Sequence, residues 1–241
     1  MRNVAGTYGR ASTAGRLAVA LLGGWMLAGT AGTAAAVQVF ATSYDMTNGD
    51  VSSPGTSLRD DSYTGGTGNP AVAYSSLAGG KGDLTDGAVA PSNWNITPLP
   101  FVGWRDNILR NPTIKFHFAD LVHLDQVSVH INKGYCPSSV DLEMNGVSRN
   151  RTVDMGISGA ANDWVIFSGL DLAGDALVVR LNDRQPEIIN GNYLSRDWIL
   201  ISEVTFDGAV VPEPTSALLI GAGMASLAAV RRRSARQCIS Q

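Results

Sequence analysis

Residues 112–118, Pro-Thr-Ile-Lys-Phe-His-Phe, decide the fold class, because apolar and polar side chains alternate along them. Residues 127–131 (Val-Ser-Val-His-Ile) and 140–144 (Val-Asp-Leu-Glu-Met) repeat this period of two. Such alternation is typical of β-strands with one face on a core and the other in solvent. We therefore expect the apolar residues to point inward. By the same parity, we expect His117 and His130 to face outward, opposite each other on neighbouring strands.

The rest of the middle of the chain continues the strand pattern. Further short apolar runs occupy residues 164–167, 176–181 and 198–206. Residues 145–146 (Asn-Gly) and 173–175 (Ala-Gly-Asp) are turn signals, and no long amphipathic helical pattern intervenes. This spacing predicts an all-β antiparallel sandwich over residues 74–210. The preceding residues 37–73 are rich in Gly, Ser and Asp, which predicts long loops around one or two strands, and residues 71–74 (Ala-Val-Ala-Tyr) form the best strand candidate.

Several short motifs occur in a characteristic order within this sandwich. They are residues 84–87 (Leu-Thr-Asp-Gly), 103–104 (Gly-Trp), 112–118, 124–130 and 198–204. This order resembles the galactose-binding-like jelly roll, the fold of discoidin and coagulation-factor type-C domains and of many carbohydrate-binding modules. The resemblance implies an antiparallel β-sandwich whose ligand site lies on loops at one end.

The same resemblance implies a structural calcium ion where the Asp-Gly corner meets the last strand. Calcium takes six to eight oxygen ligands from carboxylates and carbonyls. The candidate calcium ligands are Asp83, Asp86, Ala88, Ser202 and Glu203. Ala88 departs from relatives that carry an Asn ligand at this position. The alternative is that Asp86 caps a turn and Glu203 pairs with a basic side chain.

Sugar binding needs exposed aromatic rings with polar groups nearby. The candidate ligand-binding residues are Trp94, Trp104, Arg105, Tyr135, Arg149 and Tyr193. Trp94 lies in a polar stretch, which favours exposure. The alternative for Trp104, and for Trp198, is a place in the core.

The carboxy-terminal segment has three parts in a fixed order. Val211, Pro212, Glu213 and Pro214 precede an apolar run at residues 215–230, and Arg231, Arg232 and Arg233 follow it. A basic and polar tail, residues 234–241, ends the chain. This order over residues 211–233 resembles the PEP-CTERM family of exported bacterial proteins. The resemblance implies an exosortase-type processing enzyme as a partner and a Gram-negative bacterium that makes exopolysaccharide. The alternative is a plain single-span anchor.

Residues 1–36 read as a signal peptide, because three arginines precede a short apolar stretch and small residues follow it. We expect signal peptidase to cleave after Ala36; the alternative is an uncleaved anchor. The apolar run at residues 215–230 would be about 24 Å long as a helix, slightly short of a ~30 Å hydrocarbon core. The two ends together predict an inner-membrane intermediate and final placement at the cell surface or in the extracellular matrix.

Charge and cysteine content narrow the function further. The chain carries a net charge of −3, but the two ends hold seven of the 18 basic and one of the 21 acidic residues. The middle therefore carries 11 basic against 20 acidic residues and is near −9. Such a domain repels phosphate backbones, which argues against nucleic acid as a partner. Cys136 is the only cysteine of the middle and reads as a small buried apolar residue.

No sequence motif of catalysis is present: there is no Gly-x-Ser-x-Gly elbow, no His-Glu-x-x-His and no P-loop. We therefore expect a non-catalytic, exported module that contacts extracellular polysaccharide. Two alternatives stay open. One is a structural matrix or biofilm protein without a small ligand, and the other is a polysaccharide-degrading enzyme built on a sandwich.

Overall fold

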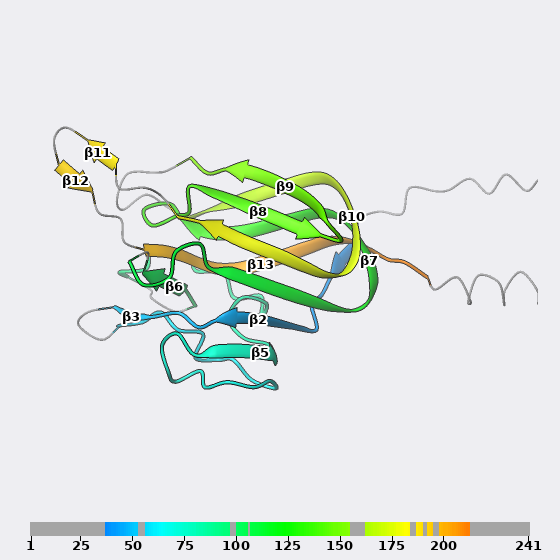
Figure 1. Cartoon of the computed structure of the whole chain (residues 1–241), viewed down its shortest axis with the longest axis horizontal. Helices are drawn as coiled ribbons and strands as arrows, with labels where there is room; N and C mark the ends of the chain where they lie inside the picture. The colour runs from blue at the N-terminus through cyan, green and yellow to red at the C-terminus, as the bar shows by residue number, and fades with distance from the viewer. Residues whose placement is uncertain are drawn as a thin grey trace, which may run out of the picture. The chain divides into compact units, whose positions relative to one another are not determined.

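Two long bent strands, β7 (Thr113–Asn132) and β10 (Asn162–Asn182), organise the fold (Figure 1). A computed structural model describes residues 37–52, 56–96, 100–105, 107–154, 162–183, 187–189, 192–194 and 198–212, with side chains left out at 52, 56, 187–189 and 192–194. All strand pairings in this part of the chain are antiparallel. The other strands are β1 (Val37–Val39), β2 (Ser43–Thr47), β3 (Val51–Ser52), β4 (Thr56–Ser57), β5 (Ser76–Gly80), β6 (Val102–Arg105), β8 (Ser139–Met144), β9 (Val147–Thr152), β11 (Glu187–Ile189), β12 (Asn192–Leu194) and β13 (Trp198–Val210).

Each half of β7 belongs to a different layer. Its first half pairs with β2 and with the second half of β10, which continues to β8 and β9. Its second half pairs with β13 and with the first half of β10, while β13 also pairs with β1 and β6. The main sheet thus runs in the order β1-β13-β7-β10-β8-β9 and folds over on itself. The all-β antiparallel sandwich is confirmed.

The bend has a local cause in β10. The register with β7 shifts between Ser168 and Leu172 and again between Gly174 and Ala176. Gly169 and Asp171 adopt φ values of +64° and +51°, a left-handed conformation that breaks the regular strand. Residues 173–175, predicted as a turn, therefore lie inside β10, and this prediction is wrong. The predicted turn at residues 145–146 is confirmed between β8 and β9.

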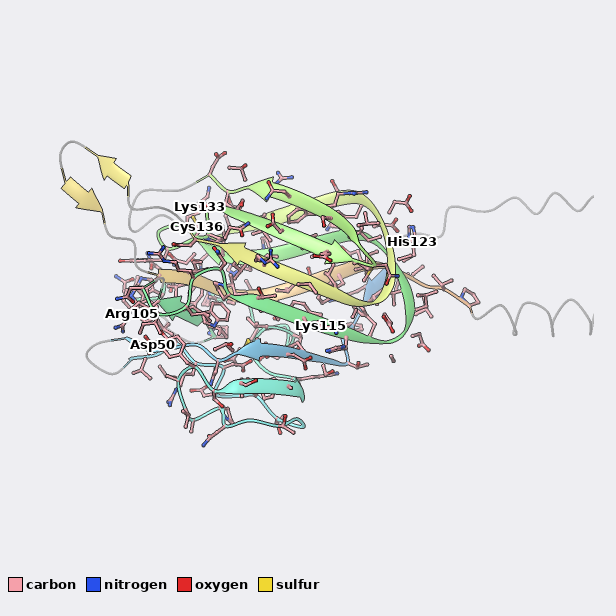
Figure 2. The ribbon with its side chains drawn as sticks, viewed as in Figure 1. Asp50, Arg105, Lys115, His123, Lys133 and Cys136 are labelled. Carbon is pink, nitrogen blue, oxygen red and sulfur yellow. The ribbon has the colours of Figure 1, made fainter. Side chains whose placement is uncertain are left out.

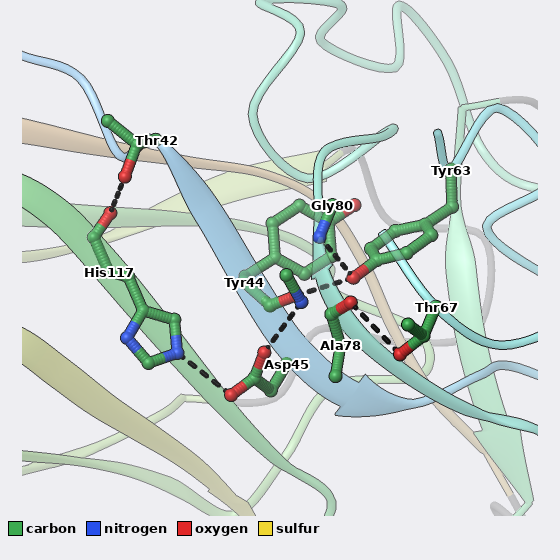
Figure 3. Close-up of polar contacts among 9 residues, drawn as sticks. Thr42, Tyr44, Asp45, Tyr63, Thr67, Ala78, Gly80 and His117 are labelled. Carbon is green, nitrogen blue, oxygen red and sulfur yellow. Dashed lines mark hydrogen bonds and ion pairs between the residues drawn. The ribbon is translucent and has the colours of Figure 1, made fainter. Parts of the chain in front are cut away.

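The alternating residues of β7 face the core as the sequence predicts. Ile114 and Phe116 are fully buried, and so are Val127 and Val129 from the other layer. The Phe116 ring lies 5.1 Å from Phe206 of β13, a contact that joins the two layers edge to face. Burial of such side chains contributes roughly 1.5–3 kcal/mol each. Outward-facing His117 is confirmed as partly exposed, and its Nε2 lies 2.8 Å from Asp45 (Figure 3).

The outward placement of His130 is wrong. His130 is 4% exposed and pairs across strands with Trp164 and Glu203 rather than with His117. The second half of β7 is covered on both faces, because residues 88–93 pack over it. Ala90 N donates to Ser202 Oγ at 3.3 Å in that covering segment. Parity within one strand cannot reveal such a second cover.

The segment before residue 74 contains long loops and four short strands, β1 to β4, where the sequence predicts one or two. It supplies β1 and β2 to the main sheet, and Tyr63 ties it to β5 (Figure 3). The Tyr63 hydroxyl donates to the carbonyl of Tyr44 at 2.8 Å and accepts from Gly80 N at 2.7 Å. Residues 71–74 form turns, and Tyr74 has a φ of +57°, so the strand predicted there is wrong.

Candidate functional site

A small second core lies at the end of the sandwich where β7 ends and β13 begins. Leu58, Ala90, Phe101 and Leu200 form it, and Trp94, Tyr135 and Trp198 pack against it, partly buried. We call Trp94, Tyr135, Trp198 and Arg105 together the aromatic end. Figure 2 shows Arg105 at this end of the molecule, with Asp50 beside it.

The rings of the aromatic end are held at defined angles. Trp94 and Tyr135 lie 5.6 Å apart at 88°, an edge-to-face pair. The Arg105 guanidinium sits 4.9 Å from the centre of the Trp198 ring, a cation–π contact. Because Trp94, Tyr135 and Trp198 are half-buried, each is fixed on one side and offers part of its surface to solvent.

Arg105 is positioned by β6 and by a carboxylate. Its Nη2 lies 3.2 Å from Asp50 Oδ2 and donates to the Val51 carbonyl at 3.3 Å. Gly103, two residues earlier, lets β6 approach β13 closely, because a Cβ there would lie 2.3 Å from Leu200 Cδ2. The close pairing of Trp198 with Arg105 depends on that approach.

One buried amide holds both loops that carry aromatic rings. Asn132 is 0% exposed, and its Nδ2 donates to Asn93 Oδ1 and to Asn162 Oδ1, each at 3.1 Å. Its Oδ1 accepts from Gly134 N at 3.0 Å. Asn162 in turn donates to the carbonyls of Ala90 and Ser92, at 2.9 Å and 2.8 Å. Trp94 and Tyr135 are therefore fixed by one hydrogen-bonded network.

The predicted ligand-binding residues divide into three groups. Trp94, Arg105 and Tyr135 come together at the aromatic end. Trp104 is fully buried in the main core, where its Nε1 donates to the Thr47 carbonyl at 2.7 Å. Arg149 reaches the Leu170 carbonyl, near the bend of β10 and away from this end. The side chain of Tyr193 lies outside the described residues.

Two members of the site were missed from the sequence. Trp198 was assigned to the core as the simplest alternative, and it lies instead half-buried under Arg105. Asn132 carried no distinguishing signal, because its partners are 30 and 39 residues away. The one sequence signal for a structural role of Asn132 is its position at the end of a strongly alternating strand.

The Asp-Gly corner meets the last strand as the resemblance implied. Gly87 N donates to Glu203 Oε2 at 3.0 Å, and Val204 N donates to the Leu84 carbonyl at 3.0 Å. Asp86 Oδ1 accepts from Ala88 N at 2.8 Å, which caps the turn. Glu203 is 3% exposed, and its burial raises its pKa to about 7.

Asp83 is a second buried carboxylate beside this corner. Its Oδ1 accepts from Ser62 Oγ at 2.5 Å, and its Oδ2 is buried without a hydrogen-bond partner. Burial, with Asp60 nearby, raises the pKa of Asp83 to about 7. Asp60 is itself buried, hydrogen-bonded to the Tyr44 hydroxyl and to Asp83 N. Asp83 and Asp60 are thus both buried where the loss of hydration disfavours the ionised carboxylate.

The five predicted calcium ligands are not all brought together by their side chains. Ser202 Oγ is engaged with His130 Nδ1 at 2.6 Å. Among the residues that the structure describes, no three His, Cys, Asp or Glu side chains are grouped closely enough to hold a metal ion. A cation here would therefore take most of its ligands from backbone carbonyls of the corner, with at most two carboxylates among Asp83, Asp86 and Glu203.

His130 and Ser202 form a buried pair rather than an exposed nucleophile and base. Ser202 is 0% exposed, and the His130 ring lies 4.8 Å from the Trp164 ring. Burial lowers the pKa of His130 to about 4, so the imidazole is neutral near pH 7. Cys136 is likewise buried, with its thiol 3.6 Å from the Lys133 carbonyl.

The sorting motif begins at the end opposite the aromatic end. β13 ends at Val210, next to β1 and to the bend of β7, and Val211 N donates to the Leu121 carbonyl at 2.8 Å. Glu213, Pro214, the apolar run 215–230, Arg231, Arg232 and Arg233 lie outside the described residues, as do residues 1–36, where the sequence predicts a signal peptide. Within the described ranges, no helix is long and apolar enough to cross a membrane.

Comparison with family models accounts for most of the chain. Residues 41–208 match the model described as "Discoidin domain-containing receptor 1/2, DS-like domain". Residues 210–233 match the PEP-CTERM protein-sorting motif. A curated relative, discoidin domain-containing receptor tyrosine kinase B of Caenorhabditis elegans, is 26% identical over 176 residues. That match covers 68% of this chain and spans 20% of the length of the relative.

Solved structures similar to this chain include three sugar-related proteins. A fucolectin from striped bass (Morone saxatilis) serum shows 15% identity over 54% of this chain and 41% of its own, with a TM-score of 0.37. The C-terminal domain of a chitobiase from Bacteroides fragilis shows 13% identity over 73% of this chain and 100% of its own, with a TM-score of 0.37. The CBM32 of AlyQ, in complex with 4,5-unsaturated mannuronic acid, shows 12% over 70% and 97%, with a TM-score of 0.38.

The family match spans both layers of the sandwich, from two residues before β2 to Gly208 near the end of β13. The sorting motif begins where that match ends. The discoidin-like fold and the PEP-CTERM tail expected from the sequence are therefore confirmed. The chain belongs to the discoidin domain-containing receptor 1/2 DS-like domain family, and it carries a PEP-CTERM protein-sorting motif directly behind that domain.

Proposed function

We propose that this protein is an exported, non-catalytic module that binds an extracellular glycan through its aromatic end. The observation that carries the proposal is the grouping of Trp94, Tyr135 and Trp198 with Arg105 on one small core. Half-exposed rings stack on the apolar faces of sugars, and adjacent hydrogen-bond donors meet hydroxyl groups. The network around Asn132 holds these rings in place before a ligand arrives.

Charge favours a neutral glycan over an acidic one. The middle of the chain is near −9, and the cation of the aromatic end, Arg105, is already paired with Asp50. An anionic polymer would meet repulsion from the whole domain at low salt. A neutral polysaccharide meets no such opposition.

Catalysis receives no support from the described residues. The Ser202–His130 pair is buried, so a substrate cannot reach it. The buried acids Asp83 and Glu203 lie under the Asp-Gly corner rather than in the aromatic end. A purely structural matrix role is the alternative if no glycan binds.

The sorting motif supports a route to the cell surface. In this proposal the apolar run 215–230 inserts in the inner membrane of a Gram-negative cell, and an exosortase-type enzyme then removes the tail. Signal peptidase removes residues 1–36 at the other end. The mature protein then belongs to the cell surface or to the exopolysaccharide matrix.

The direct test is glycan binding by the full chain and by Trp94→Ala. A panel of neutral and acidic polysaccharides is presented to the protein, and retention is measured by affinity electrophoresis. We expect retention by at least one neutral glycan and a loss of tenfold or more in Trp94→Ala. Val147→Ala, which truncates an exposed apolar side chain on β9, away from the aromatic end, is the control. A folded wild-type protein that no glycan retards contradicts the proposal and favours the structural role.

We further propose a structural calcium ion at the Asp-Gly corner, held mainly by carbonyls from residues 83–88 with no more than two of the carboxylates of Asp83, Asp86 and Glu203. The unpartnered Asp83 Oδ2 and the two buried acids support it, because a bound cation would stabilise their ionised forms. Calcium should raise the melting temperature of the wild-type protein and leave Glu203→Gln unchanged. A wild-type melting temperature that calcium does not move would exclude the site.

A further inference from the structure

The end of the sandwich opposite the aromatic end exposes a group of apolar side chains. Val37 is 65% exposed, Phe40 68%, Leu121 47% and Val210 54%. We call these four residues the exit patch, because both chain ends leave the sandwich beside it. The other large exposed apolar residues among the described ranges, such as Val72 and Ile108, lie on other segments.

The exit patch surrounds a shallow groove. Val37, Phe40 and Val210 line it together with Ala119 and other neighbours, and its volume is about 270 Å³. Val37 pairs with Gly208, and Val210 pairs with Val122, so β1, β7 and β13 all reach this point. An exposed apolar group gathered on three strands is unusual for a surface that faces only water.

The chain itself indicates what covers this patch. Val211 is hydrogen-bonded to Leu121, and Pro212 is the last described residue. The apolar run of the sorting motif starts at Thr215, three residues later. Three residues extend at most about 11 Å. A tail inserted in a bilayer therefore holds the exit patch within reach of the lipid headgroups.

We infer that the exit patch docks on the lipid bilayer while the sorting tail is in place, so that the aromatic end points away from the membrane. The inference rests on the proposed membrane insertion of the tail. Apolar side chains rather than charges make this contact, because no Lys or Arg lines the groove and its one charged residue, Asp120, is acidic. Binding should therefore not strengthen with anionic lipid.

A second copy of the chain is a poorer occupant. Stable protein interfaces use about 20–30 residues from each partner, and the exit patch has four large exposed apolar side chains. A lipid surface needs no such extent, because the tail already supplies the main anchor. The inserted tail keeps the exit patch at a high effective concentration beside the bilayer, so a contact that is weak by itself is sufficient.

The test reads the environment of Gln38, a polar, exposed residue in the wall of the groove. The chain without residues 1–36, as signal peptidase leaves it in the proposed function, carries Cys238→Ser, so that the buried Cys136 is its only other thiol. Gln38→Cys is labelled with an environment-sensitive nitrobenzoxadiazole group and reconstituted in phosphatidylcholine vesicles with or without doxyl-lipid quencher. Asn95→Cys, an exposed position next to Trp94, is the matched control.

We expect the label at residue 38 to shift to the blue and to lose at least half of its emission to the doxyl lipid. The label at residue 95 should do neither. Adding Phe40→Ser and Leu121→Ser should reduce the quenching at residue 38 by at least half while the chain stays with the vesicles.

Three results would overturn the inference, each in a different way. If the chain floats with the vesicles and residue 38 is quenched no more than residue 95, the patch does not dock, although the tail inserts. If the label shifts to the blue without quenching, protein rather than lipid covers the patch. If the chain does not float with the vesicles at all, the proposed insertion of the tail fails, and the docking inference fails with it.

Discussion

The two ends of the sandwich expose apolar side chains in different ways. At the aromatic end, Trp94 and Tyr135 are half-buried on a core of their own, and Asn132 fixes their loops. At the exit patch, Phe40 and Val210 stand out into solvent. The aromatic end has hydrogen-bonding side chains beside its rings, such as Arg105, whereas the exit patch consists of apolar side chains alone.

A surface that recognises sugar hydroxyls needs rigid rings with hydrogen-bond donors beside them, and the aromatic end has both. A surface that lies on lipid needs apolar area and no fixed geometry, and the exit patch fits that description. The aromatic end lies at the start of β13 and the exit patch at its end, so the length of the sandwich separates them. The same fold can therefore hold a ligand at one end and face a membrane at the other.

The largest effect should come from Asn132→Ala, which breaks the aromatic end. The substitution removes three hydrogen bonds of a fully buried amide and leaves Gly134 N and the side chains of Asn93 and Asn162 without this partner. We expect a loss of roughly 2–4 kcal/mol in the free energy of unfolding, at about 1–3 kcal/mol for each buried group left unsatisfied. Urea unfolding measures it, with Asn150→Ala on the exposed β9 as the control. A loss equal to that of the control would contradict the network.

Acid should loosen the aromatic end before the exit patch. His130 is linked through Ser202 to the loop that carries Trp94, because the Ser202 hydroxyl lies 2.6 Å from His130 Nδ1 and accepts from Ala90 N. The pKa of His130 is lowered to about 4 from an ordinary value near 6.5. The neutral form is favoured in the folded state, so its full contribution to stability is present above pH 6.5 and is lost as the pH falls toward 4. Besides Ser202 and Trp164, His130 has Asp163 nearby, and Asp163 favours its charged form.

This pH dependence is measured as the difference between wild type and His130→Gln. The acids Asp83 and Glu203 have raised pKa values, so their contribution to stability grows as the pH falls, opposite to that of His130. The free energy of unfolding is therefore measured for both proteins at each pH, and the two values are subtracted. We expect the stability of the wild type to fall relative to His130→Gln between pH 6.5 and 4. Hydrogen exchange should localise the change to residues 88–96. A constant difference across this range would show that His130 is not buried as a neutral ring.

Arg105→Lys should have a smaller effect that sharpens the comparison. Lysine keeps the charge beside Asp50 but lacks the planar fork that lies over Trp198. We expect a loss of about 0.5–1 kcal/mol in stability, the value of an exposed cation–π contact, and a several-fold loss in glycan binding. Equal glycan retention by Arg105→Lys and wild type in affinity electrophoresis would remove Arg105 from the site.

Substitution in the exit patch should have the smallest effect on folding. Phe40→Ser and Leu121→Ser each remove an exposed side chain, so we expect the free energy of unfolding to change by less than about 0.5 kcal/mol. Trp94→Ala, measured beside them by the same urea titration, should cost more because Trp94 packs on the second core. Equal losses at the two ends would mean that the exit patch is part of the fold.

The sequence predicts the strands well where one face is buried and the other is exposed. β7 and β8 follow the alternation of Ile114, Phe116, Val140 and Leu142. The prediction fails where a strand lacks that contrast. β5 contains Gly79 and Gly80 and has no alternating pattern, whereas the neighbouring residues 71–74, which form turns, carry the stronger strand signal.

The candidate site could be predicted only in part for a similar reason. Trp94 and Tyr135 are recognisable as aromatic residues in polar loops. Their pairing, and the placement of Trp198 under Arg105, depend on contacts between segments far apart in the chain. The buried state of His130 depends in the same way on the covering loop at residues 88–93. No local pattern records these contacts.

The central claim is that the exit patch faces lipid while the aromatic end stays free to bind a glycan. Hydroxyl-radical footprinting of the full chain on phosphatidylcholine vesicles tests it most directly. Vesicles should protect Phe40 and Leu121 and leave Trp94 and Tyr135 reactive, and a bound glycan should then protect Trp94 and Tyr135. Protection of Trp94 and Tyr135 by the vesicles, with Phe40 still reactive, would contradict the account.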